Sequence, residues 1–98
     1  MNIQAMMKQA QKLQNDMMKA KEEIDKMEFS STNGLVTVKV NGKKEIVDVK
    51  IENDADFSFE DFEMLQDMII IATNEAMGQV DKVTEEKMGR FSSIPGLF

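Results

Sequence analysis

The sequence predicts a small α+β domain in which two long helices flank a short antiparallel sheet. Three observations predict it: apolar residues recur at helical spacing from Ile3 to Met27, two valine-rich runs alternate on either side of Asn41-Gly42, and a second helical stripe begins after Phe57. The 98 residues make one domain. A monomer of about this size buries only roughly 60 to 65% of the surface that its unfolded chain exposes, so a partner chain would add stability.

The first helix is expected over about residues 3–28. Its apolar residues alternate in steps of three and four, which is the spacing of a coiled-coil seam. The members of this seam are Ile3, Met6, Ala10, Leu13, Met17, Ala20, Ile24 and Met27. Asn2 is suited to cap the helix, and without Gly or Pro before Gly34 the helix would be roughly 39 Å long. Because a small sheet does not need so long a helix, we expect the seam to be an association site and the protein to be a homodimer.

A β-hairpin is expected over about residues 35–51, where two runs alternate between apolar and polar residues. The apolar positions are Val36, Val38, Val40, Val47, Val49 and Ile51. Asn41-Gly42 between the runs is typical of a two-residue type I′ turn, which requires positive φ at both positions. This turn would place Val38 opposite Glu45 and put both apolar sets on one face of the sheet. The segment Glu28 to Ser31 is a weaker candidate for a third, edge strand.

A second helix is expected over about residues 59–88. Ser58 can cap its start, and Asp61 stands in the position of a capping-box partner. Phe57 and Phe62 stand in the positions of a hydrophobic staple. The apolar stripe of this helix comprises Phe62, Leu65, Ile69, Ala72, Ala76, Val80 and Val83.

The domain is expected to comprise residues 1–91, with fraying of the second helix near Gly89 and a tail over residues 92–98. Three apolar residues of the tail either dock on the domain or stay mobile: Ile94, Leu97 and Phe98. The longest apolar runs, such as Met68 to Ile71, are far shorter than the ~20 residues that a membrane-spanning helix needs. We therefore expect a soluble, cytoplasmic protein without a membrane partner.

The composition excludes most catalytic chemistry. Cys is absent and so is His, which excludes disulfides, Cys/His zinc sites, histidine bases and cysteine nucleophiles. None of the serines lies in a Gly-x-Ser-x-Gly nucleophile elbow, and the acidic residues around Asp54 and Glu60 lack the spacing of an EF-hand. We expect no enzyme, no cofactor and no metal site.

Positive charge is concentrated near the N-terminus of an acidic chain. The formal net charge is −6, whereas residues 7–21 contain four lysines and one aspartate, a sum of +3 that leaves −9 elsewhere. Four lysines occupy the outer face of the first helix, away from the seam: Lys8, Lys12, Lys19 and Lys26. Lys21 flanks the seam. The outer face is either the solvated back of a packing helix or a surface that contacts phosphates.

The 10 methionines suggest a different function. Exposed, flexible methionines can form a surface that adapts to several protein partners. Most of them fall at core spacing, but Met7 and Met18 lie off the seam. A dimeric protein-interaction scaffold is therefore the alternative hypothesis.

Four stretches together resemble a known family over essentially the full length. They are "MMKQAQKLQNDMMKAKEEI", "NGLVTVKVNGKKEIVDVKI", "LQDMIIIATNEAMGQVDKVTEEKM" and the closing "IPGLF". Their order and motifs are similar to those of the YbaB/EbfC family of bacterial nucleoid-associated proteins. One departure is "STNG" before the first clear strand, where family members often have successive glycines.

The resemblance implies an α-β-β-β-α protomer and a homodimer whose long helices project like the jaws of tweezers. It implies a non-enzymatic protein of the bacterial nucleoid that binds double-stranded DNA and affects DNA compaction and gene expression. Two protomers sum to −12, so phosphate contact is expected only on the lysine-bearing helices. The expected DNA-binding residues are Lys8, Lys12, Lys19 and Lys21, with Lys82, Lys87 and Arg90 as a second choice.

Overall fold

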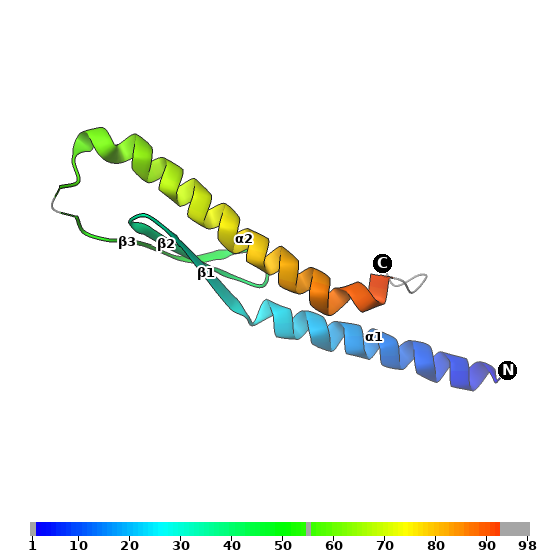
Figure 1. The fold of residues 1–98 in the computed structure, drawn as a ribbon. Coiled ribbons are helices and arrows are strands. Elements are labelled where there is room, and N and C mark those ends of the chain that lie inside the picture. Colours follow the sequence, from blue (N-terminus) through cyan, green and yellow to red (C-terminus); the bar gives the residue numbers. More distant parts are fainter. Residues whose placement is uncertain (1, 55, 93–98) are drawn as a thin grey trace.

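The computed structural model describes residues 2–54 and 56–92, and these form an α-β-β-β-α protomer (Figure 1). Its elements are α1 (Ile3–Asp25), β1 (Glu28–Asn33), β2 (Val36–Asn41), β3 (Ile46–Ile51), the 3-10 turn η1 (Phe59–Asp61) and α2 (Phe62–Ser92). The predicted fold class is thus confirmed, including the weakly signalled third strand. The apolar tail residues Ile94, Leu97 and Phe98 lie outside the described residues.

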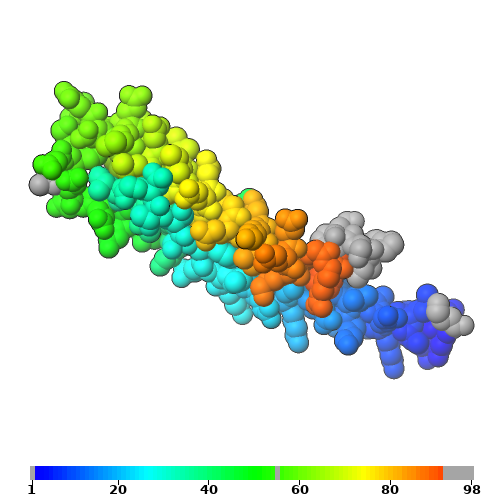
Figure 2. All heavy atoms as spheres, viewed as in Figure 1, coloured from blue at the N-terminus to red at the C-terminus, as the bar shows by residue number. Residues whose placement is uncertain are grey.

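The molecule is elongated, with principal extents of 72 × 19 × 14 Å. Figure 1 shows α2 lying along the sheet with its first half and beside α1 with its last turns. The N-terminal half of α1 projects beyond the end of α2, which gives the narrow end seen in Figure 2. A projecting helix of this kind buries little of its own surface, so most of its side chains are available for contact.

The start of α1 follows from local chemistry, whereas its end does not. The Asn2 side chain accepts a hydrogen bond of 3.0 Å from the Gln4 backbone N–H, as predicted for an N-cap. The helix ends at Asp25, three residues before the expected end, although no Gly or Pro stops it. The chain leaves the helix because Met27 and the residues after it pair elsewhere: the Met27 carbonyl accepts a 3.0 Å hydrogen bond from the Gly42 backbone N–H.

The sheet has the order β1-β2-β3, and both pairs are antiparallel. The predicted register of the second hairpin is wrong, because Val38 pairs with Val49 and not with Glu45. The connection is longer than a two-residue turn: Asn41 accepts a 3.0 Å hydrogen bond from the Lys44 backbone, and positive φ occurs at Lys44 (63°). This is a type I turn followed by a left-handed residue. The shift is an even number of residues, so both apolar sets still share one face.

The core lies between α2 and the first two strands. Val36, Val38 and Val40 are fully buried in one cluster with residues of α2, two of which are alanines. The buried set is completed by Phe29, Ala72, Ala76 and Val80. Two alanines on the helix allow it to lie close to the sheet, which is how β-branched side chains on one face become completely covered.

The start of α2 confirms the predicted capping signals. The Ser58 backbone N–H donates a 2.8 Å hydrogen bond to the Asp61 carboxylate. The rings of Phe57 and Phe62 meet edge to face with 5.5 Å between their centres, as expected of a hydrophobic staple. The other end of α2 continues past Gly89 to Ser92, and Phe91 in this last turn is fully buried.

Candidate nucleic-acid interface

The outer face of α1 carries three exposed lysines, Lys8, Lys12 and Lys19, which we call the lysine stripe. Lys26, the fourth lysine expected on this face, is the C-cap that follows the last helical residue, Asp25. At 3.6 residues per turn the three lysines of the stripe lie roughly 140° around the helix from the seam. None of the three forms an ion pair within the described part of the chain, where the pairs are Lys44–Asp81 and Lys87–Glu23. Their ammonium groups are therefore available to an external anion.

The electrostatic potential around α1 becomes more positive toward its N-terminus. Residues 2–15 contain Lys8 and Lys12 and no acidic residue. The nearest acidic residue along the helix is Asp16. Lys8 is about 12 Å along the helix from Asp16, beyond the ~8 Å Debye length at physiological salt, whereas Lys12 is about 6 Å from it. Lys19 lies within one turn of Glu22, so its field is partly offset. The strongest positive potential is therefore at the projecting end of the helix.

Lys21 lies apart from the lysine stripe. It lines an open hollow of about 460 Å³ together with Lys44 and two acidic residues, Asp25 and Asp81. Lys44 is already paired there, with 2.9 Å between its Nζ and an Asp81 carboxylate oxygen. The mixed charges make this hollow a poor anion site. Lys43 also lines this hollow, because the hairpin loop is longer than a two-residue turn and reaches α1. The sequence analysis assumed the shorter turn and therefore did not predict this contact.

The second group of predicted DNA-binding residues lies at the end of α2. Two of its three side chains already contact other side chains of the protein. Lys87 lies 3.7 Å from a carboxylate oxygen of Glu23 on α1. The Arg90 guanidinium lies over the Phe91 ring, 4.4 Å from its centre. Lys82 is exposed but has acidic residues at positions 85 and 86, one turn further along the helix. These residues do not join the lysine stripe in one surface.

The seam of α1 divides into a packed half and an exposed half. In the C-terminal half Ile24 is 3% exposed, and Met17 and Ala20 are half-buried. Met27, which was expected in the seam, is half-buried but lies beyond the end of the helix at Asp25. In the N-terminal half, which we call the N-terminal seam, Leu13 is half-buried and the other three residues are exposed. This half comprises Ile3, Met6, Ala10 and Leu13. The packed half contacts α2 in the same chain, since Ile24 lines a common hollow with Thr84 and Met88.

A second apolar surface lies on β3, which α2 does not cover. Val47, Val49 and Ile51 are 44 to 47% exposed. They share the face of the buried β2 valines, as the pairing of Val38 with Val49 shows. On α2, Glu75 accepts a 2.6 Å hydrogen bond from Ser31 of β1, so this side of the helix faces β1. Because β1 and β3 are at opposite edges of the sheet, the other side of α2 faces β3. That flank carries Phe62 and Ile69. We call these residues the β3 surface: Val47, Val49, Ile51, Phe62 and Ile69.

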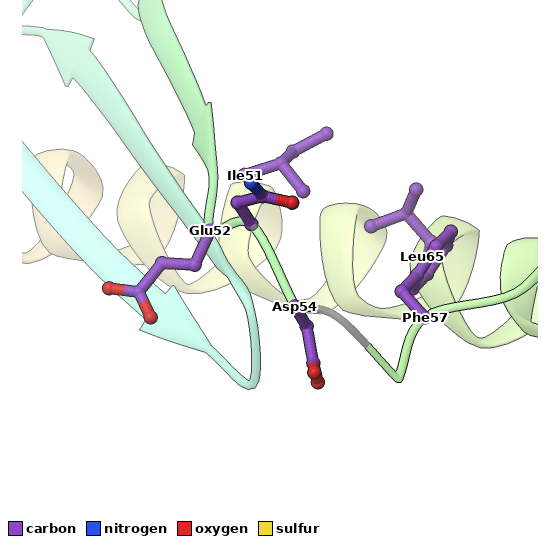
Figure 3. A pocket seen from close by; sticks show the side chains of 6 residues that line it. Ile51, Glu52, Asp54, Phe57 and Leu65 are labelled. Carbon is purple, nitrogen blue, oxygen red and sulfur yellow. The ribbon is translucent and has the colours of Figure 1, made fainter.

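An open hollow of about 450 Å³ lies between the end of β3 and the start of α2 (Figure 3). Figure 3 shows the carboxylates of Glu52 and Asp54 pointing away from Phe57 and Leu65. Polar groups thus do not converge on one point in it. Among residues 2–54 and 56–92, no three acidic side chains are placed to hold a metal ion. No helix in the same ranges is long and apolar enough to cross a membrane.

Comparisons with known proteins agree on one family. The sequence profile of the YbaB/EbfC DNA-binding family matches residues 1–94. A nucleoid-associated protein of Oceanobacillus iheyensis is 45% identical over 102 residues, which cover 99% of this chain and 97% of the relative. A nucleoid-associated protein of Clostridium novyi is 45% identical over 103 residues, covering 100% and 90%. The crystal structure of an uncharacterized protein of Helicobacter pylori has the same fold, with a TM-score of 0.76 at 21% identity over 95% of this chain and 99% of that one.

Proposed function

Because the chain belongs to the YbaB/EbfC DNA-binding family, we propose that it is a non-enzymatic, nucleoid-associated protein that grips double-stranded DNA as a homodimer. The lysine stripe of α1 supplies the phosphate contacts. Binding of this kind compacts DNA and affects gene expression. The names of the relatives, which associate them with the nucleoid, support the same location for this protein.

The observation that carries the proposal is the position of the positive charge. Lys8 and Lys12 are exposed on the part of α1 that projects beyond the acidic remainder of the molecule (Figure 1). A dimer has a formal charge of −12, so DNA would be repelled from most of its surface. When the duplex contacts only the projecting helices, it stays at a distance from that acidic surface. Salt screens the electrostatic repulsion over this distance.

Lysine contacts of this kind read shape and charge, not sequence. Lysine ammonium groups bind phosphates as point charges, whereas base recognition usually requires bidentate Arg, Asn or Gln contacts in a groove. Arg90 is the only arginine of the chain, and it lies over the Phe91 ring. Weak sequence preference follows.

The homodimer is proposed to form on the β3 surface. This surface combines three β-branched side chains that are nearly half exposed with apolar residues of α2. The outer edge of β3 has no strand beside it in the sheet order β1-β2-β3. The N-terminal seam is a weaker candidate, because a coiled coil needs about three to four heptads and only about one and a half remain exposed. A dimer on the β3 surface leaves both projecting helices free for DNA.

The protein-interaction scaffold remains the second candidate, and exposed methionines favour it. Met7 is 66% exposed and Met18 is 54% exposed on α1. Replacing both with glutamine would abolish partner binding by a scaffold and leave DNA affinity unchanged.

The test is a binding titration with a random-sequence duplex of about 30 base pairs. We expect binding at ~50 mM salt and a steep loss of affinity toward ~200 mM, because each neutralised phosphate releases counterions. Absence of binding at ~50 mM salt would exclude the proposal. Sedimentation at micromolar concentration tests the dimer, and a species of only 11.1 kDa would exclude it.

A further inference from the structure

We propose that Gln11 and Asn15 on α1, which we call the amide pair, read adenine bases in the major groove of the DNA that the lysine stripe holds. The inference rests on the proposed DNA binding and adds a base preference to it. Both side chains are exposed. Neither side chain takes part in a hydrogen bond within residues 2–54 and 56–92, so the donor and the acceptor of each amide are available to a ligand.

The amide pair lies beside the lysine stripe on the outer face of α1. Gln11 and Asn15 are four residues apart, so they are neighbours on one face of the helix, about 6 Å apart along its axis. Lys8 is three residues before Gln11, and Lys12 is three residues before Asn15. Each amide therefore has an exposed lysine about one turn away on the same face.

The projecting part of α1 is thin enough to enter the major groove (Figure 1). Every residue from Ile3 to Lys12 is exposed, so no other described part of the chain covers this stretch of helix. A bare helix with its side chains is about 10–12 Å wide, and the major groove of B-DNA is about 12 Å wide. The phosphates line the walls of the groove, and the base edges form its floor. Lysines of the inserted helix then contact the walls, and the amides beside them meet the floor.

The charge of this face fits entry into the groove. An acidic side chain on the inserted face would be repelled by the phosphates of both walls. Residues 2–15 contain no acidic residue. Asp16, which follows, lies roughly 100° around the helix from Asn15. The amide pair can therefore approach the base edges without bringing a negative charge with it.

The chemistry of a carboxamide selects adenine. Its amino group donates and its carbonyl accepts, and adenine presents the complementary N7 acceptor and N6 donor side by side in the major groove. Guanine presents two acceptors, N7 and O6, so the carbonyl of the amide would face an acceptor there. The lysines favour no adenine, because an ammonium group only donates. Two amides about 6 Å apart along the helix match about two base-pair steps of ~3.4 Å, so the preference covers a short site.

Duplexes that separate the two grooves test the proposal. Three duplexes of about 30 base pairs contain only A·T, only G·C or only inosine·cytosine pairs, each in mixed order. An inosine·cytosine pair has the major-groove edge of G·C, but it lacks the 2-amino group, so its minor-groove edge matches that of A·T. In fluorescence anisotropy at ~50 mM salt, the natural protein should bind the A·T duplex about 5- to 10-fold more tightly than either of the others. This is the low end for bidentate contacts, because exposed side chains lose rotamer freedom on binding.

Two matched variants assign the preference to particular side chains. Gln11→Ala/Asn15→Ala keeps a helix-favouring residue at both positions and should lower the affinity ratio of A·T to G·C duplex to about 1. The control, Gln9→Ala/Gln14→Ala, removes two amides that lie roughly 100 to 120° around the helix from Asn15. The control should keep the ratio of the natural protein.

Four results would overturn the proposal: equal affinity of the natural protein for A·T and G·C duplexes, inosine·cytosine bound as tightly as A·T, an unchanged ratio in Gln11→Ala/Asn15→Ala, or the same loss of ratio in both variants. The second result would assign the preference to the minor groove or to DNA shape. Equal, salt-dependent binding of all three duplexes would overturn the base preference alone and leave the lysine–phosphate contacts standing. Absence of binding to every duplex would overturn the proposed DNA binding together with it.

Discussion

Replacing Lys8, Lys12 and Lys19 with glutamine is the most direct perturbation of the lysine stripe. All three side chains are exposed, and none forms an ion pair within residues 2–54 and 56–92. Glutamine has nearly the helix propensity of lysine, so the stability of α1 should change by only a few tenths of a kcal/mol. Circular dichroism of the variant should match that of the natural protein. Any change in DNA affinity then reports on charge.

The magnitude follows from the number of lysines. Three per protomer give six in a dimer that grips one duplex, and each phosphate contact contributes about 0.9 to the slope of log K against log salt. The natural protein should therefore lose roughly 10³-fold in affinity between ~50 and ~200 mM salt. Removing all six contacts should reduce the slope by about 5 and leave binding weak and nearly independent of salt.

Fluorescence anisotropy with a labelled duplex of about 30 base pairs measures both affinity and slope. The matched control replaces three other lysines with glutamine: Lys39, Lys43 and Lys50, which are exposed on the sheet and its loop. The control changes the net charge of the chain by the same −3. Equal losses in the two variants would show that only total charge matters, and an unchanged slope in the first would refute phosphate contact by α1.

Two further perturbations test the interface and the packing. Val49→Glu on the β3 surface should convert the dimer to an 11.1 kDa monomer in sedimentation, because burying a carboxylate in the interface is costly. Lys50→Glu on the other face of the sheet should leave the protein dimeric. If both variants are dimers, the β3 surface is not the dimer interface. Gly42→Ala should cost about 1 to 3 kcal/mol in urea unfolding, because its methyl group would overlap the Ile24 carbonyl. Gly78→Ala, in open space on α2, should instead stabilise by up to ~1 kcal/mol, and a loss there would contradict the helix-propensity argument.

Local signals predicted the elements that depend on neighbouring residues. Asn2 at the start of α1 and Phe57 before α2 act within one turn of the chain, so their effect is readable in the sequence. The longer connection after Asn41 was not readable, because Asn-Gly fits both a two-residue turn and a type I turn that continues to Lys44. Contact between Gly42 and the end of α1 accompanies the longer form.

The candidate site divides in the same way. Helical periodicity alone separated the lysines of α1 from its seam, and the structure keeps that separation. Periodicity could not show that Lys21 lies among acidic residues or that Lys87 pairs with Glu23, since both depend on how α1 meets α2. It also could not show that β3 lies outside the cover of α2.

By itself, the sequence determined the order of elements, the face of each element and the polarity of charge along the chain, because these depend on spacing and on residue type. Only the tertiary structure decided which half of the seam is packed, where the register of the hairpin falls and which apolar face is left open. These features depend on contacts between residues that are distant in sequence. Val38 is buried and its partner Val49 is nearly half exposed, although both are valines in alternating strands, because a single helix covers two strands of three.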